Sequence, residues 1–374
     1  MDGIKRRMAS VLVAVLGASA AVASLPVVTA AAGPTVFATG LDSPRGLAFD
    51  ERGNLYVAEG GVGGKIQTTP ADCQQVAFPI GPYSGDFTAR ISKISRNGTR
   101  QTVASGLPSS QTAPTLGSLI SGVGDVAFQD DHLYALTAGA GCSHGLIGTS
   151  NALLRVRRNG TTVMVANLSA FLATHPVANP DNNPATGDFE PDGTWYGLVA
   201  IGDTFYAVEP NHQELDRIRK DGAVSRVIDF SKTYPGNTDW RGPTAIAKRG
   251  GSLYIGTLTP FPTHVGAAEV WKVDPRTGQF AVFAAGLTSV LGLAFGEDGS
   301  LFVLEMSVVP GGPRPFTGDV VRIHGGSRSL IASGLNFPTG IALGPDHALY
   351  VSNFGFGFPA GTGQILRIPV PGDD

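Results

Sequence analysis

The stretch Leu55-Tyr56-Val57 returns five more times along this chain, each time as an aromatic residue between two apolar ones. The later copies are Leu133-Tyr134-Ala135, Phe205-Tyr206-Ala207, Leu253-Tyr254-Ile255, Leu301-Phe302-Val303 and Leu349-Tyr350-Val351. Their aromatic centres, starting from Tyr56, are separated by 78, 72, 48, 48 and 48 residues. Equal spacing of this size is typical of repeat proteins, in which each copy builds one structural unit. The chain should therefore contain six such units.

Each copy lies among further short apolar runs that are separated by polar turns. In the first unit, the run 46–49 precedes the turn 50–53, and Arg96-Asn97-Gly98 separates the third and fourth runs. Asn-Gly and Asp-Gly pairs between apolar runs favour tight hairpins, because both turn residues adopt positive φ. Four short antiparallel strands in each unit of about 40 to 50 residues are typical of a propeller blade. The sequence predicts an all-β, six-bladed β-propeller with four antiparallel strands in each blade.

The sixth copy ends at its third strand, near Ile368, so its fourth strand must come from elsewhere. Residues 35–41 resemble the fourth strands of other units, such as 103–107 and 331–335. We expect strand 35–41 to complete the last blade and close the ring, because closure removes an exposed sheet edge.

Residues 1–32 have the parts of a secretory signal peptide. Lys5-Arg6-Arg7 precedes an apolar, small-residue-rich stretch, and 28–30 and 30–32 both resemble A-x-A cleavage sites. A membrane anchor is the alternative for this segment. No other apolar run reaches the roughly 20 residues needed to span a bilayer. We therefore expect an exported, secreted protein whose residues 33–374 form a single propeller domain.

The composition excludes one class of partner. The formal net charge is −3, and outside the signal-like segment 1–32 the sequence contains no basic patch, so nothing suggests nucleic-acid binding. We expect a monomer.

The two cysteines, Cys73 and Cys142, follow the aromatic strands of the first two units, and in an oxidising compartment they would form a disulfide. Two free thiols are the alternative.

The connections between the predicted strands are very unequal. Tight turns occupy one face of the predicted ring, and the long connections all belong to the other: about 60–88, 108–121, 138–150, 169–194, 231–241, 258–268, 306–317 and 354–362. Loops that cluster on a rigid scaffold usually carry function. We therefore expect ligands to bind at the long-loop face, around the mouth of the axial channel, although the loops can also lack a function.

Candidate metal ligands end several of the aromatic strands on that face, namely Glu59, Glu209, Glu305 and Asn353. Oxygen ligands that converge on one axis would suit calcium. The same side chains can instead accept hydrogen bonds from loop amides. Asp181 and Asp188, in the acidic loop 179–193, are further candidates for calcium, with Asx turns as the alternative explanation.

Aromatic and basic residues also fall near the predicted mouth. They are Arg45, Trp195, Tyr196, Trp240 and Arg241. Such a rim suits a peptide, a glycan or a small aromatic ligand, or it simply anchors the loops. The sequence contains no His-x-x-x-His or Cys-x-x-Cys pair, no Gly-x-Ser-x-Gly motif and no phosphate-binding loop.

The segments 43–49, 55–59, 81–85 and 179–197 resemble the ScyD/ScyE family of secreted propeller proteins. More loosely, the repeats are similar to NHL and SMP-30/gluconolactonase-type propellers. The resemblance covers essentially all of residues 33–374 and implies a six-bladed propeller, but little about chemistry. The sequence differs from the family at two positions: Glu209 stands where an aspartate is expected, and Trp195 stands where a proline is expected.

Two functions follow as hypotheses. The first is a secreted propeller that binds an unknown small molecule, glycan or protein through its long-loop face, without catalysis. The alternative is a calcium-dependent hydrolase of the lactonase type that uses the same mouth, for which Glu59, Glu305 and Asn353 match the resemblance best.

Overall fold

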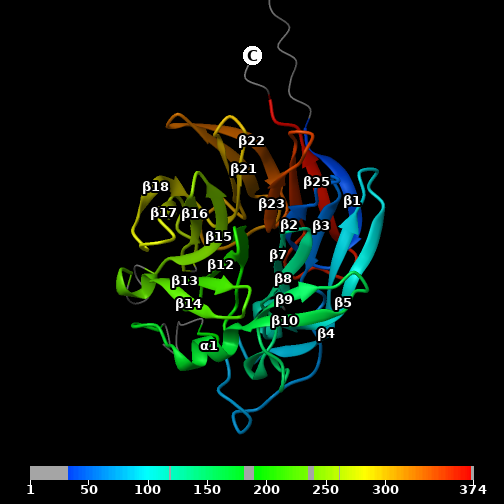
Figure 1. Cartoon of the computed structure of the whole chain (residues 1–374), viewed down its shortest axis with the longest axis vertical. Coiled ribbons are helices and arrows are strands. Elements are labelled where there is room, and N and C mark those ends of the chain that lie inside the picture. Colours follow the sequence, from blue (N-terminus) through cyan, green and yellow to red (C-terminus); the bar gives the residue numbers. More distant parts are fainter. Residues whose placement is uncertain (1–32, 118, 181–188, 235–239, 261, 372–374) are drawn as a thin grey trace, which may run out of the picture. The chain divides into compact units, whose positions relative to one another are not determined.

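A computed structural model describes residues 33–371, except for 118, 181–188, 235–239 and 261. Six antiparallel sheets follow one another around an axis, in the order of the sequence repeats (Figure 1). The predicted six-bladed, all-β fold is confirmed. Within these residues, no helix is both long enough and apolar enough to cross a membrane.

The innermost strand of each blade borders the axis, and the later strands lie progressively further out. The first blade contains β2 (Pro44–Phe49), β3 (Leu55–Glu59), β4 (Ser84–Ile94) and β5 (Arg100–Gln111). The second blade contains β7 (Val123–Gln129), β8 (His132–Thr137), β9 (Ala152–Val156) and β10 (Thr162–Asn167). The third blade contains β11 (Gly197–Ile201), β12 (Thr204–Glu209), β13 (Glu214–Arg219) and β14 (Val224–Asp229). The fourth blade contains β15 (Gly242–Arg249), β16 (Ser252–Leu258), β17 (Ala268–Val273) and β18 (Phe280–Leu287).

The fifth blade contains β19 (Val290–Phe295), β20 (Leu301–Glu305), β21 (Gly318–His324) and β22 (Ser327–Leu335). The sixth contains β23 (Gly340–Leu343), β24 (Leu349–Asn353) and β25 (Gly363–Ile368). Its outermost strand is β1 (Thr35–Leu41), which pairs antiparallel with β25 from Thr35 opposite Arg367 to Leu41 opposite Gly363. The two ends of the ring therefore share one sheet.

The first blade departs from the four-strand plan. Its strand β5 is long, so Ser110 and Gln111 extend beyond the blade and pair with the short strand β6 (Ile120–Ser121). Thr88 and Pro108, which the sequence predicted to lie in loops, belong to β4 and β5. The helical segments are short and lie in connections: α1 (Leu168–Thr174), η1 (Pro114–Leu116), η2 (Cys142–His144) and η3 (Phe230–Lys232).

The core consists of apolar clusters between neighbouring blades. The aromatic residue of each repeat packs against the next blade, so it recurs once in every blade. Tyr56 packs edge-on against Phe128 of the next blade, with ring centres 4.9 Å apart. Tyr254 packs in the same way against Phe295 at 4.7 Å. The last junction, between blades six and one, buries Leu41, Val57 and Tyr350 together. Each blade thus needs its neighbour to cover its apolar face.

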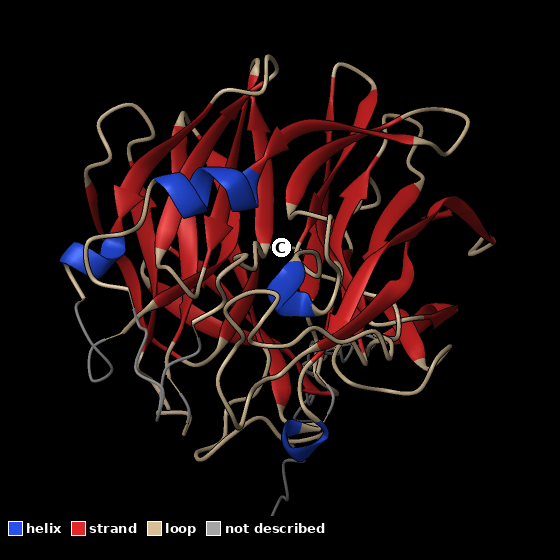
Figure 2. Cartoon of the chain, turned by 90° about the horizontal axis from the view of Figure 1, so that it is seen from below, coloured by secondary structure: helices blue, strands red, loops and turns tan. Residues whose placement is uncertain are grey.

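The hairpin turns and the long connections lie at opposite ends of the strands (Figure 2). At the tight-turn end, Gly98 and Gly222 have φ of 83° and 89°, a conformation that glycine adopts without steric cost. At the other end lie the long connections, including 60–83, 138–151 and 306–317. This end is called the long-loop face below.

Candidate functional site

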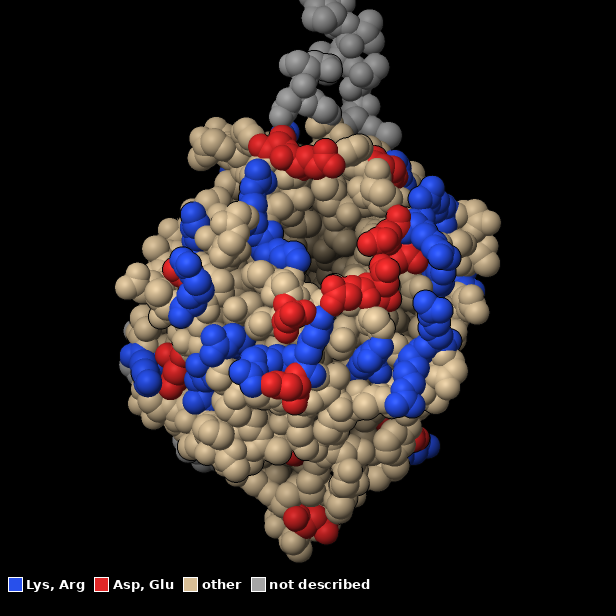
Figure 3. All heavy atoms as spheres, in the orientation of Figure 1, with Lys and Arg blue, Asp and Glu red and all other residues tan. Residues whose placement is uncertain are grey.

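The innermost strands of all six blades enclose a cavity of about 280 Å³ on the axis. The face drawn in Figure 3 is hollowed near its centre, close to where β2, β15 and β23 are labelled in Figure 1. Most of the residues that line it are apolar. The polar side chains are Asp125, Tyr196, Thr244, Lys248 and Thr339. The volume is close to the lower end of the ~300–1,000 Å³ range of ligand pockets, so the cavity suits a small molecule.

Asp125, in β7, is the acidic side chain of this cavity. Its Oδ1 accepts the Val126 backbone N–H at 2.8 Å, and its Oδ2 accepts that of Leu198 in the next blade, also at 2.8 Å. Burial raises the pKa of Asp125 to about 7, although the two amide hydrogen bonds oppose the shift. A carboxyl group with such a pKa can accept or donate a proton near neutral pH.

The sequence predictions missed Asp125, although a signal was present. The corresponding position at the start of the innermost runs is glycine or threonine in the other five copies: Gly46, Gly197, Thr244, Gly292 and Gly340. The small residues leave space around the axis, and the one carboxyl group among them lies in that space. The signal in the sequence was therefore an acidic residue at a repeat position that holds glycine or threonine in the other five copies.

A second, smaller pocket of about 20 Å³ lies at the long-loop end of the cavity and shares Tyr196, Thr244, Leu291 and Thr339 with it. Arg45 lines this pocket and is 6% exposed. Its guanidinium donates a hydrogen bond to the Ile120 carbonyl and lies 5.8 Å from the ring centre of Tyr196. The channel therefore narrows towards the long-loop face, where the sequence predicted the mouth of the axial channel.

The structure brings Arg45, Trp195 and Tyr196, three of the residues expected near the mouth, together along the small pocket. Trp195 is fully buried in the core between blades two and three, and its Nε1 donates to Asp216 at 3.1 Å. Trp240 and Arg241 line neither of these two cavities. Trp240 packs tightly against Gly242, and Arg241 lies 5.9 Å from the ring centre of Tyr234.

The candidate calcium ligands at the strand ends are engaged with loop amides. Glu59 accepts the Asp42 N–H at 2.7 Å, Glu209 that of Thr194 at 2.8 Å, and Asn353 that of Asn336 at 2.8 Å. Glu305 accepts the Thr288 N–H in the same way. Each side chain thus holds the segment leading into its own blade, and none of the four lines either cavity.

Their immediate partners differ from blade to blade. Glu59 is paired with Arg90, whose guanidinium lies 2.8 Å from its Oε2. Glu305 instead faces Asp319, the opposite residue in the ladder between β20 and β21. Burial and the neighbouring Asp319 carboxyl raise the pKa of Glu305 to about 8, and burial raises that of Asp319 to about 6. The pair therefore holds a proton at neutral pH.

Across the described ranges, no three His, Cys, Asp or Glu side chains lie close enough together to hold a metal ion. Glu59, Glu209 and Glu305 do not form such a group. Asp181 and Asp188 lie outside the described residues, as does the segment 1–32 predicted to be a signal peptide.

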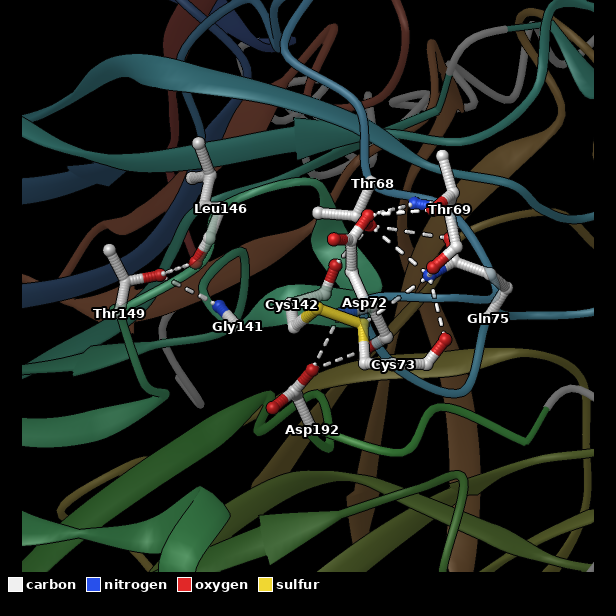
Figure 4. The surroundings of a disulfide bond; sticks show 11 residues. Thr68, Thr69, Asp72, Cys73, Gln75, Gly141, Cys142, Leu146, Thr149 and Asp192 are labelled. Carbon is white, nitrogen blue, oxygen red and sulfur yellow. Dashed lines mark hydrogen bonds between the residues drawn. A yellow bond between two sulfur atoms is a disulfide. The ribbon is translucent and has the colours of Figure 1, made fainter.

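The predicted disulfide is confirmed: Cys73 and Cys142 are joined, with an S–S distance of 1.99 Å and a sequence separation of 69 residues (Figure 4). Hydrogen bonds surround the bridge. Thr68 Oγ1 donates to the Cys142 carbonyl at 2.7 Å, and Asp192 accepts the Ser143 N–H at 2.7 Å. The bridge joins two long connections from adjacent blades.

A buried polar cluster lies in the same loops. Ser110 Oγ lies 2.9 Å from His144 Nδ1, Glu190 lies 3.4 Å from His144 Nε2, and the Tyr83 hydroxyl donates to Glu190 at 2.5 Å. All four side chains are buried. Burial lowers the pKa of His144 to about 4, so the imidazole is neutral at pH 7. The cluster joins four segments of the long-loop face and is enclosed by them.

Comparison with known proteins supports the fold. No protein-family model matches the sequence, and no curated protein matches it. A solved structure named glucose dehydrogenase matches with a TM-score of 0.53 and 12% identity, over 91% of this chain and 100% of its own. A gluconolactonase, XC5397 of Xanthomonas campestris, matches with a TM-score of 0.52 and 11% identity, over 90% and 89% of the two chains. At these identities the likeness shows the fold, while the ScyD/ScyE family remains a resemblance.

Proposed function

We propose that this chain is a hydrolase of small cyclic esters, of the lactonase kind, which works in its axial cavity with Asp125 as general base. The observation that carries the proposal is the position of Asp125. It is the acidic side chain in the lining of a cavity that is the right size for one sugar ring, and its pKa is close to neutral. Perturbed carboxyl groups in cavities are a common feature of active sites.

The names of the fold neighbours agree with this choice of reaction. One is a gluconolactonase and another a glucose dehydrogenase, so both concern glucose or its lactone. The gluconolactonase name fits a hydrolase, and both names fit an enzyme better than the non-enzymatic binding module that the sequence favoured. Because the identities are 11% and 12%, they suggest which substrates to test first and do not assign the reaction.

The chemistry needs one base that later acts as an acid. The Asp125 carboxylate takes a proton from a water molecule as the water oxygen attacks the lactone carbonyl carbon. The bond between that carbon and the ring oxygen then breaks, and the Asp125 carboxyl returns the proton to the departing oxygen. The product is an open-chain hydroxy acid. General acid–base catalysis of this kind contributes about 10²- to 10⁴-fold in rate.

Calcium does not fit the side chains that were expected to bind it. Each of Glu59, Glu209, Glu305 and Asn353 already accepts a loop amide, and no three candidate side chains meet within the described segments. No step of the proposed reaction passes through calcium. The assay below includes calcium, because Asp181 and Asp188 remain candidates.

We also infer that the protein works outside the reducing cytoplasm. The Cys73–Cys142 disulfide supports this inference, because disulfides persist in oxidising compartments. Export through residues 1–32 would provide the route.

The test is a pH-indicator assay on residues 33–374 with the disulfide intact. The substrates are D-glucono-1,5-lactone and a panel of four-, five- and six-carbon lactones, with and without about 10 mM calcium, which exceeds the Kd of about 1 mM of weak extracellular sites. We expect turnover by the wild type and a fall in kcat/KM of about 100-fold or more in Asp125→Asn. Asp131→Asn is the control, because Asp131 is exposed in the adjacent turn of the same blade.

Two results would contradict the proposal. One is the lack of turnover of every lactone under both calcium conditions. The other is turnover that Asp125→Asn leaves unchanged while the melting temperature stays that of the wild type.

A further inference from the structure

Arg45 is a buried cation at the end of the axial cavity. It is 6% exposed, and its neighbours are the Ile120 carbonyl, which accepts a hydrogen bond, and two aromatic rings. The ring centre of Phe356 lies 5.1 Å from the guanidinium carbon and that of Tyr196 lies 5.8 Å away. The Tyr196 hydroxyl also shares a hydrogen bond with the guanidinium. Aromatic faces and neutral oxygens stabilise a cation only partly.

No carboxylate of the described residues lies within ion-pair distance of Arg45. Other partly buried arginines of this protein are paired: Arg90 with Glu59 and Asp42, and Arg226 with Glu214. Burying a charge without an opposite charge is costly, and burial accordingly lowers the pKa of Arg45. A negatively charged group on a ligand would offset the free-energy cost of burying the Arg45 guanidinium.

The position of Arg45 connects it to the proposed reaction. It lines the small pocket that shares four residues with the axial cavity. The next residue in the chain, Gly46, contacts the Asp125 carboxylate. A ligand in the cavity can therefore reach Arg45 at the long-loop end while another of its atoms lies beside Asp125.

We propose that Arg45 binds an anionic oxygen group of the ligand, so that the preferred substrates are lactones of sugar acids that carry a second, free acid group. The planar guanidinium suits a carboxylate or a phosphate. The lactone part of this statement rests on the function proposed above, whereas the binding of an anion at Arg45 does not. Burial of Arg45 keeps most water away from its guanidinium, which strengthens its attraction for the anion.

The binding experiment needs no turnover and uses a matched pair of probes. Calorimetry on residues 33–374 compares D-glucuronate with D-glucuronamide, which has the same ring and lacks the charge, and adds D-glucose 6-phosphate as the phosphate probe. We expect at least one of the two anions to bind tenfold or more tightly than the amide. If glucuronate binds and the phosphate does not, the partner is a carboxylate, and the reverse result identifies a phosphate.

Variants then locate the anion. Arg45→Met should remove the preference for the anion, and Arg45→Lys, which keeps the charge but not the planar fork, should retain part of it. Arg314→Met is the matched control, because Arg314 is exposed on the same long-loop face and lines neither cavity. Failure of both anions to bind more tightly than glucuronamide, or an unchanged preference for the anion in folded Arg45→Met, would each overturn the proposal.

The kinetic experiment separates this proposal from the function. D-glucaro-1,4-lactone carries a free carboxylate, and D-glucono-1,4-lactone does not. If both are hydrolysed equally and Arg45→Met has no effect on their ratio, the hydrolase stands and the role of Arg45 fails. If glucuronate binds through Arg45 and no lactone is hydrolysed, the anion site stands and the hydrolase fails.

Discussion

Gly46 in β2 and Asp125 in β7 approach so closely that a Cβ atom on residue 46 would lie 1.8 Å from Asp125 Oδ1. The two residues belong to neighbouring blades, and their contact occurs in the lining of the axial cavity. The carboxylate is further held by the Leu198 amide of the third blade. Three blades thus determine where the acid lies, and the predictions below follow from this and related contacts.

Gly46→Ala should displace the Asp125 carboxylate, because atoms at 1.8 Å overlap. Overpacking of this kind costs about 1–3 kcal/mol of unfolding free energy, measured by urea denaturation. The lactone kcat/KM should fall together with the stability. Gly312→Ala is the control, since a Cβ there meets no atom within 4 Å. Equal stability of the two variants would show that the contact is not tight in solution.

The rate of lactone hydrolysis should depend on pH through Asp125. The base is the deprotonated form, and its pKa is raised to about 7. We therefore expect kcat/KM to rise as the pH increases from 5 to about 8 and then to level off. A profile without a transition between pH 6 and 8, recorded under conditions where the enzyme remains folded, would argue against this role of Asp125.

The Glu305–Asp319 pair should make the protein more stable in mild acid. Both carboxyl groups have raised pKa values in the folded state, about 8 and about 6, so the folded chain binds more protons than the unfolded chain between about pH 4 and 8. The free energy of unfolding therefore falls as the pH rises through this window. Glu305→Gln should reduce that fall, because the amide does not ionise.

Urea denaturation at pH 5, 6, 7 and 8 measures this effect. Glu51→Gln is a suitable control, because Glu51 is exposed in a turn and should not alter the slope. If the wild type and Glu305→Gln lose stability in parallel between pH 5 and 8, the pair does not carry a shared proton.

Removal of the disulfide should destabilise the long-loop face. The bridge closes a loop of 69 residues, and the chain-entropy model then predicts a loss of about 4 kcal/mol in the double variant Cys73→Ser/Cys142→Ser. A reductant should lower the stability of the wild type to that of the variant, and should leave the variant itself unchanged. Identical denaturation curves of oxidised wild type and variant would contradict the prediction.

Much of the fold could be predicted because it depends on local patterns that repeat. The period of Tyr56, Tyr254 and their counterparts predicted six blades, since each aromatic residue must pack on the next blade. The disulfide was also predictable, because Cys73 and Cys142 occupy corresponding loops of adjacent blades. The extra strand β6 was not, because it depends on how far β4 and β5 extend beyond their blade.

The candidate site was predicted less well. Of the aromatic and basic residues expected near the mouth, Arg45 and Tyr196 line the small pocket, whereas Trp240 and Arg241 line neither cavity. The sequence placed the strand-end residue Glu59 on the long-loop face, but it did not show where the carboxylate points. In the structure the carboxylate points to Arg90 and the Asp42 amide. Direction depends on which neighbouring group a side chain finds, and a one-dimensional pattern does not contain this information.

By itself, the sequence determined the number of blades, the order of strands and the pairing of the two cysteines, because these follow from spacing and from the need to cover apolar faces. The tertiary structure alone decided that Asp125 lies in the axial cavity and that Arg45 has no carboxylate partner among the described residues. Both facts depend on how residues that are distant in the sequence meet in the folded ring, and burial of each side chain raises the pKa of Asp125 and lowers that of Arg45.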